Sequence, residues 1–154
     1  MAKKIVSVGM SLASDDVDYV QFSDRASLLD WDVIIFCPDI HEFTSYDYGM
    51  GEYQGKPSLS DSRSFALKEA CAHWRRELKE AVDIGKTVVV HLCKPNEVFV
   101  ATGEKTTSGT GRNQKVTRIV SNFDNYSCLP VKFNWNVGRG REVLLRPEFR
   151  EVMA

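Results

Sequence analysis

Two apolar runs, one on each side of an amphipathic segment, constrain the fold of this chain more than any other feature. Residues Val33 to Cys37 are all apolar and are closed by Pro38, and a second, largely apolar run covers Thr87 to Leu92. Continuous runs of this length are typical of strands that are covered on both faces, as in a parallel sheet. The two runs therefore predict two buried parallel strands.

The segment between them, residues 61–84, repeats apolar side chains with the period of a helix. The apolar stripe consists of Leu67, Cys71, Trp74, Leu78, Ala81 and Val82. Ser60 or Asp61 opens the predicted helix, and Gly85 supplies the left-handed residue that often ends one. Strand, helix and strand together predict a βαβ unit, and this unit indicates an α/β protein with a parallel sheet.

Shorter patterns add strands to this unit. Residues 3–10 form an apolar run that ends in glycine, and residues 17–22 alternate in the manner of an edge strand. Residues 97–103 and 115–123 alternate and are rich in β-branched side chains, so they predict a hairpin with a long polar loop. The predicted fold is one domain over 1–154, a three-layer Rossmann-like (flavodoxin-like) α/β arrangement with a mostly parallel sheet and an appended β-hairpin.

Other segments have weaker patterns. The stretch 39–60 is rich in Gly and Tyr, and a loop of this length is often functional, so we expect it to contain a short helix. Residues 124–130 predict a turn or short helix, and 141–147 a last short strand. Residues 147–154 predict the start of a helix with no stop signal. We therefore expect the first domain of a longer protein, the alternative being a frayed natural end.

The charge balance and the hydropathy narrow the class of protein. The formal net charge is −1, so no overall field attracts the chain to nucleic acid or to an anionic membrane. No apolar run approaches the roughly 20 residues that span a bilayer, and the run after the basic N-terminus is too short for a signal peptide. These features predict a cytosolic protein that does not contact a membrane.

The cysteines do not indicate a metal site. Cys37, Cys71, Cys93 and Cys128 contain no CxxC pair, and the combination of one histidine with one glutamate at 41–42 is too small a ligand set for zinc. We expect four reduced thiols that pack as small hydrophobic groups, and we expect no metal and no cofactor.

The candidate ligand site lies where the parallel strands end. Ligands of open parallel sheets bind beyond the carboxyl ends of the strands, and the N-terminus of helix 61–84 points to the same edge and favours an anion. The candidate ligand-binding residues are Ser11, Asp39, His41, Glu42, Arg63, His91, Cys93 and Lys94. Each also has a structural interpretation: Asp39 can begin a turn after Pro38, and Cys93 can be a packed thiol.

The polar loop 103–118 is a second candidate surface. It contains "SGTGRNQK", which lacks the spacing and the following helix of a phosphate-binding loop. Its cations, which face one carboxylate at Glu104, are Lys105, Arg112, Lys115 and Arg118. We expect this loop to contact a partner. A solvated turn and a nucleic-acid contact are the alternatives, the latter with little aromatic surface nearby for stacking.

The order of "WDVIIFCPD", a loop and "HWRRELKEAVDIGKTVVVHLCKP" resembles the class I glutamine-amidotransferase-like (flavodoxin-like) group over residues 3–95. Catalytic members of that group carry a Gly-x-Cys-x-Gly nucleophile elbow between a strand and a helix. In "HLCKP" both glycines are missing around Cys93, and Pro95 leads into β structure. The resemblance therefore implies a Rossmann-like scaffold without that group's hydrolysis, and with no catalytic residue.

These observations predict a non-catalytic ligand-sensing or interaction module of a larger cytosolic bacterial or phage protein. It would bind a small anionic ligand or a protein partner at the carboxyl edge of the sheet. The first alternative is a hydrolase or transferase for a nucleotide or glycosyl substrate. Its acid and base groups would be Asp39, Glu42 and His91, with Arg63 clamping an anion. The second alternative is nucleic-acid binding through the loop 103–118, with an affinity that falls steeply with salt.

Overall fold

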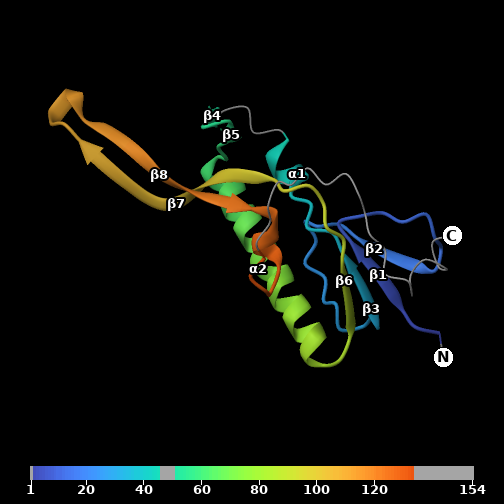
Figure 1. The fold of residues 1–154 in the computed structure, drawn as a ribbon. Coiled ribbons are helices and arrows are strands. Elements are labelled where there is room, and N and C mark those ends of the chain that lie inside the picture. The colour runs from blue at the N-terminus through green and yellow to red at the C-terminus, as the bar shows by residue number, and fades with distance from the viewer. Residues whose placement is uncertain (1, 46–50, 134–154) are drawn as a thin grey trace.

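The computed structural model describes residues 2–45 and 51–133 (Figure 1). In chain order its helices and strands are β1 (Ile5–Val8), β2 (Val17–Val20), β3 (Val33–Phe36), α1 (His41–Thr44), β4 (Glu52–Tyr53), β5 (Lys56–Pro57), α2 (Asp61–Asp83), β6 (Thr87–Val90), β7 (Glu97–Ser108) and β8 (Lys115–Asp124). Two 3₁₀ turns, η1 (Gly111–Asn113) and η2 (Asn125–Cys128), complete the set. The strand predicted at 141–147 and the helix predicted at 147–154 lie outside the described residues.

Four parallel strands form the central sheet in the order β2-β1-β3-β6. β3 and β6 pair directly, with Val33 opposite Thr87 and Phe36 opposite Val90, and α2 connects them. The predicted βαβ unit and the α/β class with a parallel sheet are therefore confirmed. β2 lies at the edge of the sheet and runs parallel to β1.

The ends of α2 follow from the local sequence. Ser60 is the N-cap, and its hydroxyl accepts a hydrogen bond from the backbone N–H of Arg63 at 3.4 Å. Gly85 follows the helix with φ +86°, a conformation that a glycine adopts without steric cost. Among the described residues, no helix is both long and apolar enough to cross a membrane.

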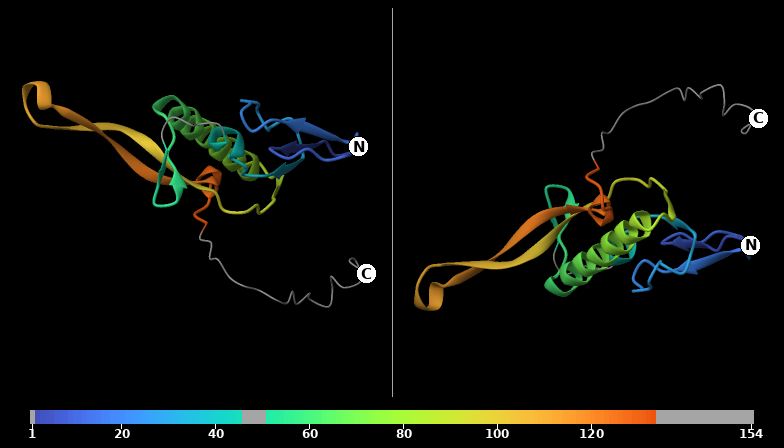
Figure 2. Two further views of the ribbon diagram at one scale, coloured as in Figure 1. Left: turned by 90° about the horizontal axis from the view of Figure 1, so that it is seen from above. Right: turned by 90° about the horizontal axis from the view of Figure 1, so that it is seen from below.

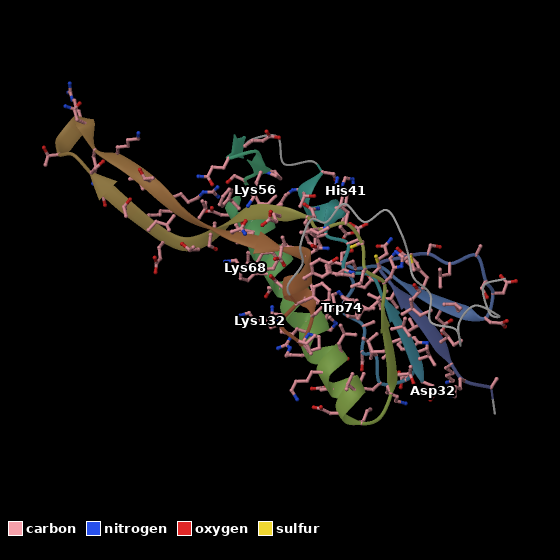
Figure 3. The ribbon with its side chains drawn as sticks, viewed as in Figure 1. Asp32, His41, Lys56, Lys68, Trp74 and Lys132 are labelled. Carbon is pink, nitrogen blue, oxygen red and sulfur yellow. A yellow bond between two sulfur atoms is a disulfide. The ribbon has the colours of Figure 1, made fainter. Side chains whose placement is uncertain are left out.

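The core lies between α2 and one face of the sheet. The sheet contributes Val6, Val8, Ile34 and Phe36, all fully buried. From the helix, Trp74 enters the core and donates its indole N–H to the carbonyl of Phe22 at 2.7 Å (Figure 3). Figure 2 shows α2 along one side of the sheet. Within residues 2–45 and 51–133, α2 is the helical layer on this sheet. The predicted three-layer arrangement needs a second helical layer on the other face, and that layer is not among the described elements.

The expectation of four reduced thiols is wrong for two of them. A disulfide joins Cys71 of α2 to Cys128 of η2, whereas Cys37 and Cys93 are free. The two bonded cysteines are 57 positions apart in the chain, so no local pattern signals the pairing. They meet because η2 packs on the helix after the hairpin returns.

The predicted hairpin is confirmed, but its loop is much shorter than the expected 103–118. β7 and β8 form a separate two-stranded sheet in which Thr106 pairs with Thr117 and Thr107 pairs with Val116. The β-branched side chains in the polar stretch keep it extended, so only residues 109–114 turn at the tip. The two strands project as an arm from the body (Figure 1).

The long stretch 39–60 and the stretch 124–130 are as irregular as predicted. The first contains the short helix α1 and the two-residue strands β4 and β5, and the second contains η2.

Candidate ligand site at the carboxyl edge of the sheet

Two cavities lie at the carboxyl ends of the parallel strands and share one wall. The first has a volume of about 430 Å³ and is lined by Pro38, Asp39, His41, Cys93, Lys94, Pro95, Asn96 and Asn125. The second has a volume of about 290 Å³ and is lined by Gly9, Tyr19, Phe22, Asp39, His41, Glu42 and Ser45. We call them the β3–β6 cavity and the β1–β3 cavity, after the strands whose ends they adjoin. Asp39 and His41 line both.

The shared wall is a tight turn between β3 and α1. The Oδ1 atom of Asp39 accepts the backbone N–H of His41 at 2.9 Å, and the N–H of Asp39 donates to the carbonyl of Cys37 at 2.8 Å. This aspartate thus has both the turn role and the site position that the sequence offered as alternatives. Figure 3 shows His41 at α1, above the end of the sheet.

The far wall of the β3–β6 cavity is built around Cys93. Its thiol donates to the carbonyl of Pro38 at 3.4 Å and accepts from the amide of Asn125 at 3.3 Å. Burial, and then the neighbouring Cys93 thiol, raises the pKa of Cys37 to about 12. The two free cysteines therefore sit side by side, with Cys37 behind the cavity wall and Cys93 in it.

Asn125 closes the cavity from the base of the hairpin. The residue is fully buried, and its Oδ1 accepts the backbone N–H of Asn96 at 3.1 Å. Sequence reasoning missed Asn96 and Asn125, because the end of β8 reaches the segment after β6 only through hairpin pairing. The sequence held one signal for this position, namely that the polar residues Asn125 and Tyr126 directly follow a strand.

The β1–β3 cavity also contains residues that were not predicted. Tyr19 and Phe22 come from β2 and the turn after it. Gly9 lies at the end of β1 with φ +77°, and a Cβ atom there would lie 2.5 Å from the carbonyl oxygen of Cys37. Only glycine allows the two chain segments to approach this closely.

Three predicted site residues line neither cavity. The Nη1 atom of Arg63 donates to the carbonyls of Glu42 and Phe43 at 3.3 and 3.2 Å, which ties α1 to α2. The backbone N–H of His91 donates to the carbonyl of Phe36 at 2.8 Å, and its side chain is exposed, as is Ser11. The structure thus brings together Asp39, His41, Glu42, Cys93 and Lys94 from the predicted set, and leaves these three apart.

The cations predicted for the loop 103–118 divide into two groups. Lys105, Arg112 and Lys115 are exposed along the arm and at its tip. Arg118 is instead held at the base of the arm by Asp61 at 2.7 Å and by the carbonyl of Leu59 at 2.9 Å. The hydrogen bond from this guanidinium lowers the pKa of Asp61.

A further hollow of about 590 Å³ lies at the opposite edge of the sheet, where the strands begin. Its carboxylate at Asp32 accepts the backbone N–H of Lys4 at 3.0 Å and faces Lys86 at 3.6 Å. These contacts, the Lys4 hydrogen bond first, lower the pKa of Asp32. Since the carboxylate of Asp32 is already engaged by Lys4 and Lys86, we do not assign a ligand to this hollow.

Within the part of the chain that the structure describes, no three His, Cys, Asp or Glu side chains gather in a group that could hold a metal ion. Comparison of this chain with protein-family models, curated proteins and solved structures finds no match.

Proposed function

We propose that this chain is a non-catalytic binding module whose ligand is a small anion in the β3–β6 cavity. The observation that carries the proposal is the wall formed by Asp39 and His41, which places a cavity on each side of the end of β3. Ligands of open parallel sheets bind in this region, next to the point where the strand order reverses. In the order β2-β1-β3-β6 the reversal lies between β1 and β3. The β1–β3 cavity adjoins that point, and the β3–β6 cavity lies one strand further on, across the wall of Asp39 and His41.

The chemistry of the β3–β6 cavity favours an anion. Lys94 brings a positive charge, and the side-chain amide of Asn96 brings a donor, whereas the amide of Asn125 is already engaged by the Cys93 thiol. The carboxylate of Asp39 opposes an anion, but one of its oxygens already accepts the N–H of His41. A volume of about 430 Å³ falls in the range of roughly 300–1,000 Å³ that is usual for small-molecule sites. A phosphate or carboxylate group would find its main partner in Lys94.

The strand order also supports the finer fold proposal. A flavodoxin-like sheet begins with the order 2-1-3 and continues outward from the third strand, and the four parallel strands follow that order. The chain departs from the usual pattern between β1 and β2, where no helix lies among the described elements. We therefore propose a Rossmann-like scaffold in which that connection is shortened.

Catalysis by the predicted acid and base groups has less support. Asp39 and Glu42 line the β1–β3 cavity, but His91 lines neither cavity and Arg63 is engaged by two backbone carbonyls. A general base must come within hydrogen-bond reach of the proton that it removes. The arrangement therefore favours binding over a hydrolase or transferase reaction.

Titration calorimetry tests the proposal with inorganic phosphate, a nucleoside monophosphate and a sugar phosphate as probes. We expect at least one probe to bind, and we expect Lys94→Ala to raise its Kd by about tenfold or more, since a charged hydrogen bond contributes roughly 1.5–3 kcal/mol. Lys115→Ala is the matched control, because it removes the same charge from the arm. If no probe binds, or if both variants weaken binding equally, the proposal is wrong.

A second candidate function is nucleic-acid binding by the arm. The specific observation is a projecting ribbon that carries three exposed cations, Lys105, Arg112 and Lys115, and a two-stranded ribbon fits the major groove of a duplex. Fluorescence anisotropy with a labelled duplex, measured from low to physiological salt, tests it. Binding that weakens steeply with salt and is lost in Arg112→Ala supports this function, and binding insensitive to salt excludes it.

A further inference from the structure

The outer half of the arm, residues 104–117, is a two-stranded ribbon that stands in solvent, and we call it the outer arm. Thr106 pairs with Thr117 and Ser108 pairs with Lys115 across it, and every one of its residues is exposed. Within the part of the chain that the structure describes, it packs against no residue of the core cluster. A two-stranded ribbon by itself is marginally stable in water, and a further strand or a packed surface stabilises it. The outer arm therefore has the properties of a surface that a partner completes.

The outer arm is positively charged on both of its faces. Its cations are Lys105, Arg112 and Lys115, and its one carboxylate is Glu104. Side chains alternate between the two faces of a strand, and Ser108 pairs with Lys115, so Lys105 and Lys115 lie on opposite faces of the ribbon. Among the described residues, none of the three cations forms a salt bridge. All three are therefore available to an acidic partner.

An acidic surface surrounds β2, the edge strand of the parallel sheet. β2 pairs with β1 on one side, and no described strand pairs with its other side. Four exposed carboxylates lie on it or next to it, and they are Asp15, Asp16, Asp18 and Asp24. None of them forms a salt bridge within the described residues. The donors to Asp18 and Asp24 are an indole N–H and a backbone N–H, which carry no charge, so the surface stays negative. We call it the acidic edge.

We propose that the outer arm of one copy of this chain docks along the acidic edge of a second copy, in the manner of a strand added to a sheet. Figures 1 and 2 show the arm and β2 at opposite ends of the molecule, so the arm cannot reach β2 of its own chain. The lengths match, because β2 (Val17–Val20) and the paired rows of the outer arm from Lys105 to Ser108 each extend about 13 Å. This contact is independent of the proposed anion site.

The charges select this contact over the other ways in which two copies could meet. Arm against arm would bring cations together, and edge against edge would bring carboxylates together, which is how edge strands are usually kept apart. Arm against edge brings opposite charges together. Each surface also has an apolar side chain for the centre of the contact, since Tyr19 on β2 is 50% exposed and Val116 on the arm is 60% exposed. A nucleic-acid duplex would engage the cations alone, whereas a second copy accounts for both surfaces.

Sedimentation velocity of the full chain, purified free of nucleic acid, tests this proposal. We expect a species larger than the monomer at about 100 μM protein, since a small contact between charged surfaces binds weakly. The association should be strong in about 10 mM salt, where the Debye length is about 30 Å, and weak in about 1 M salt, where it is about 3 Å. A chain that stays monomeric in low salt, or one that associates equally at both salt concentrations, overturns the proposal.

Reversing the charges of either surface should weaken the association. Arg112→Glu combined with Lys115→Glu changes the outer arm, and Asp15→Lys combined with Asp16→Lys changes the acidic edge. We expect each pair to raise the dissociation constant of self-association by about tenfold or more, because it places like charges opposite each other. If either pair leaves the dissociation constant unchanged, the contact is not the proposed one.

Arg76→Glu combined with Lys79→Glu is the matched control for the arm variant. It changes the net charge by the same amount, but at exposed positions of α2, and it should leave the dissociation constant nearly unchanged. A control that weakens association as much as the arm variant would show an effect of net charge rather than of the two surfaces, and would contradict the proposal. The substituted positions are all exposed, so circular dichroism should show an intact fold in every variant.

A chain that carries both pairs of reversals separates a second copy from nucleic acid as the partner of the arm. Its arm is acidic and its edge is basic, so the two surfaces are complementary again, and we expect self-association to return to within about threefold of the original chain. A duplex that bridged two arms would be repelled by the acidic arm. If the chain with both reversals stays monomeric, the proposal is wrong.

Discussion

Replacing Trp74 with Phe tests the packing of α2 on the sheet. The Trp74 side chain is fully buried, and its ring lies 6.4 Å from that of Phe22 and 6.2 Å from that of Phe36, between centroids. Its indole N–H donates to the carbonyl of Phe22 at 2.7 Å. The substitution keeps an aromatic ring in the stripe of the helix but removes the donor and part of the ring volume.

Two costs determine the expected loss of stability. The carbonyl of Phe22 loses its partner in a buried setting, which costs about 1–3 kcal/mol. The smaller ring leaves a space of roughly 40 Å³, and at about 24 cal/mol per Å³ this adds about 1 kcal/mol. We therefore expect Trp74→Phe to lower the free energy of unfolding by about 2–4 kcal/mol, a large part of the 5–15 kcal/mol that is typical of a domain.

Trp31→Phe is the matched control for this prediction. Its indole N–H also donates at 2.7 Å, but to the exposed carboxylate of Asp18, where water can replace the lost donor. We expect a loss below about 1 kcal/mol. Urea unfolding at pH 7, followed by far-ultraviolet circular dichroism, measures both variants. A Trp74→Phe variant no less stable than Trp31→Phe would refute the account of the core.

Four further predictions concern the cysteines and the base of the arm. Reducing the disulfide between Cys71 and Cys128 should lower the free energy of unfolding by up to about 4 kcal/mol, which is the chain-entropy value for a loop closed by residues 57 positions apart. A midpoint of urea unfolding that does not change after reduction would argue against this cross-link. Iodoacetamide at pH 8 should alkylate Cys37 about three orders of magnitude more slowly than a thiol of ordinary pKa, since its pKa is raised to about 12; peptide mapping of the folded protein checks this. Because the pKa of Cys37 is raised to about 12, the folded state holds the thiol proton more tightly than the unfolded state. The contribution of Cys37 to the free energy of unfolding is therefore complete below about pH 9 and is lost as the pH rises toward 12. If Cys37→Ala had the same dependence of stability on alkaline pH, this explanation would be wrong. Arg118→Ala should raise the pKa of Asp61 toward its ordinary value, because the hydrogen bond from the guanidinium is the main cause of the lowered pKa. NMR titration of the Asp61 carboxyl group measures this pKa, and an unchanged pKa in the variant would exclude that cause.

Parts of the candidate site could be predicted from the sequence because strand ends are local signals. Asp39 and Lys94 follow apolar runs, so the parallel pairing of β3 with β6 brings both to one edge. The strand-end argument also placed His91 there, and the N-terminus of the predicted helix placed Arg63 there. Both expectations failed because the orientation of a side chain depends on its contacts. Arg63 turns to the carbonyls of α1, and His91 lines neither cavity.

The sequence by itself determined the elements whose signals lie within one helix turn or one strand. Helical periodicity, the Ser60 cap and Gly85 determined α2, and the apolar runs determined β3 and β6. These signals are local because a cap or a strand is specified by residues only a few positions apart.

Only the tertiary structure decided the features that join distant segments. The disulfide of Cys71, the place of Asn125 in the β3–β6 cavity and the attachment of Arg118 to Asp61 each connect positions far apart in the chain. The resemblance to flavodoxin-like proteins stays a prediction. Long-range partners depend on how whole elements pack, and no single stretch of sequence encodes that packing, since many arrangements satisfy the same local pattern.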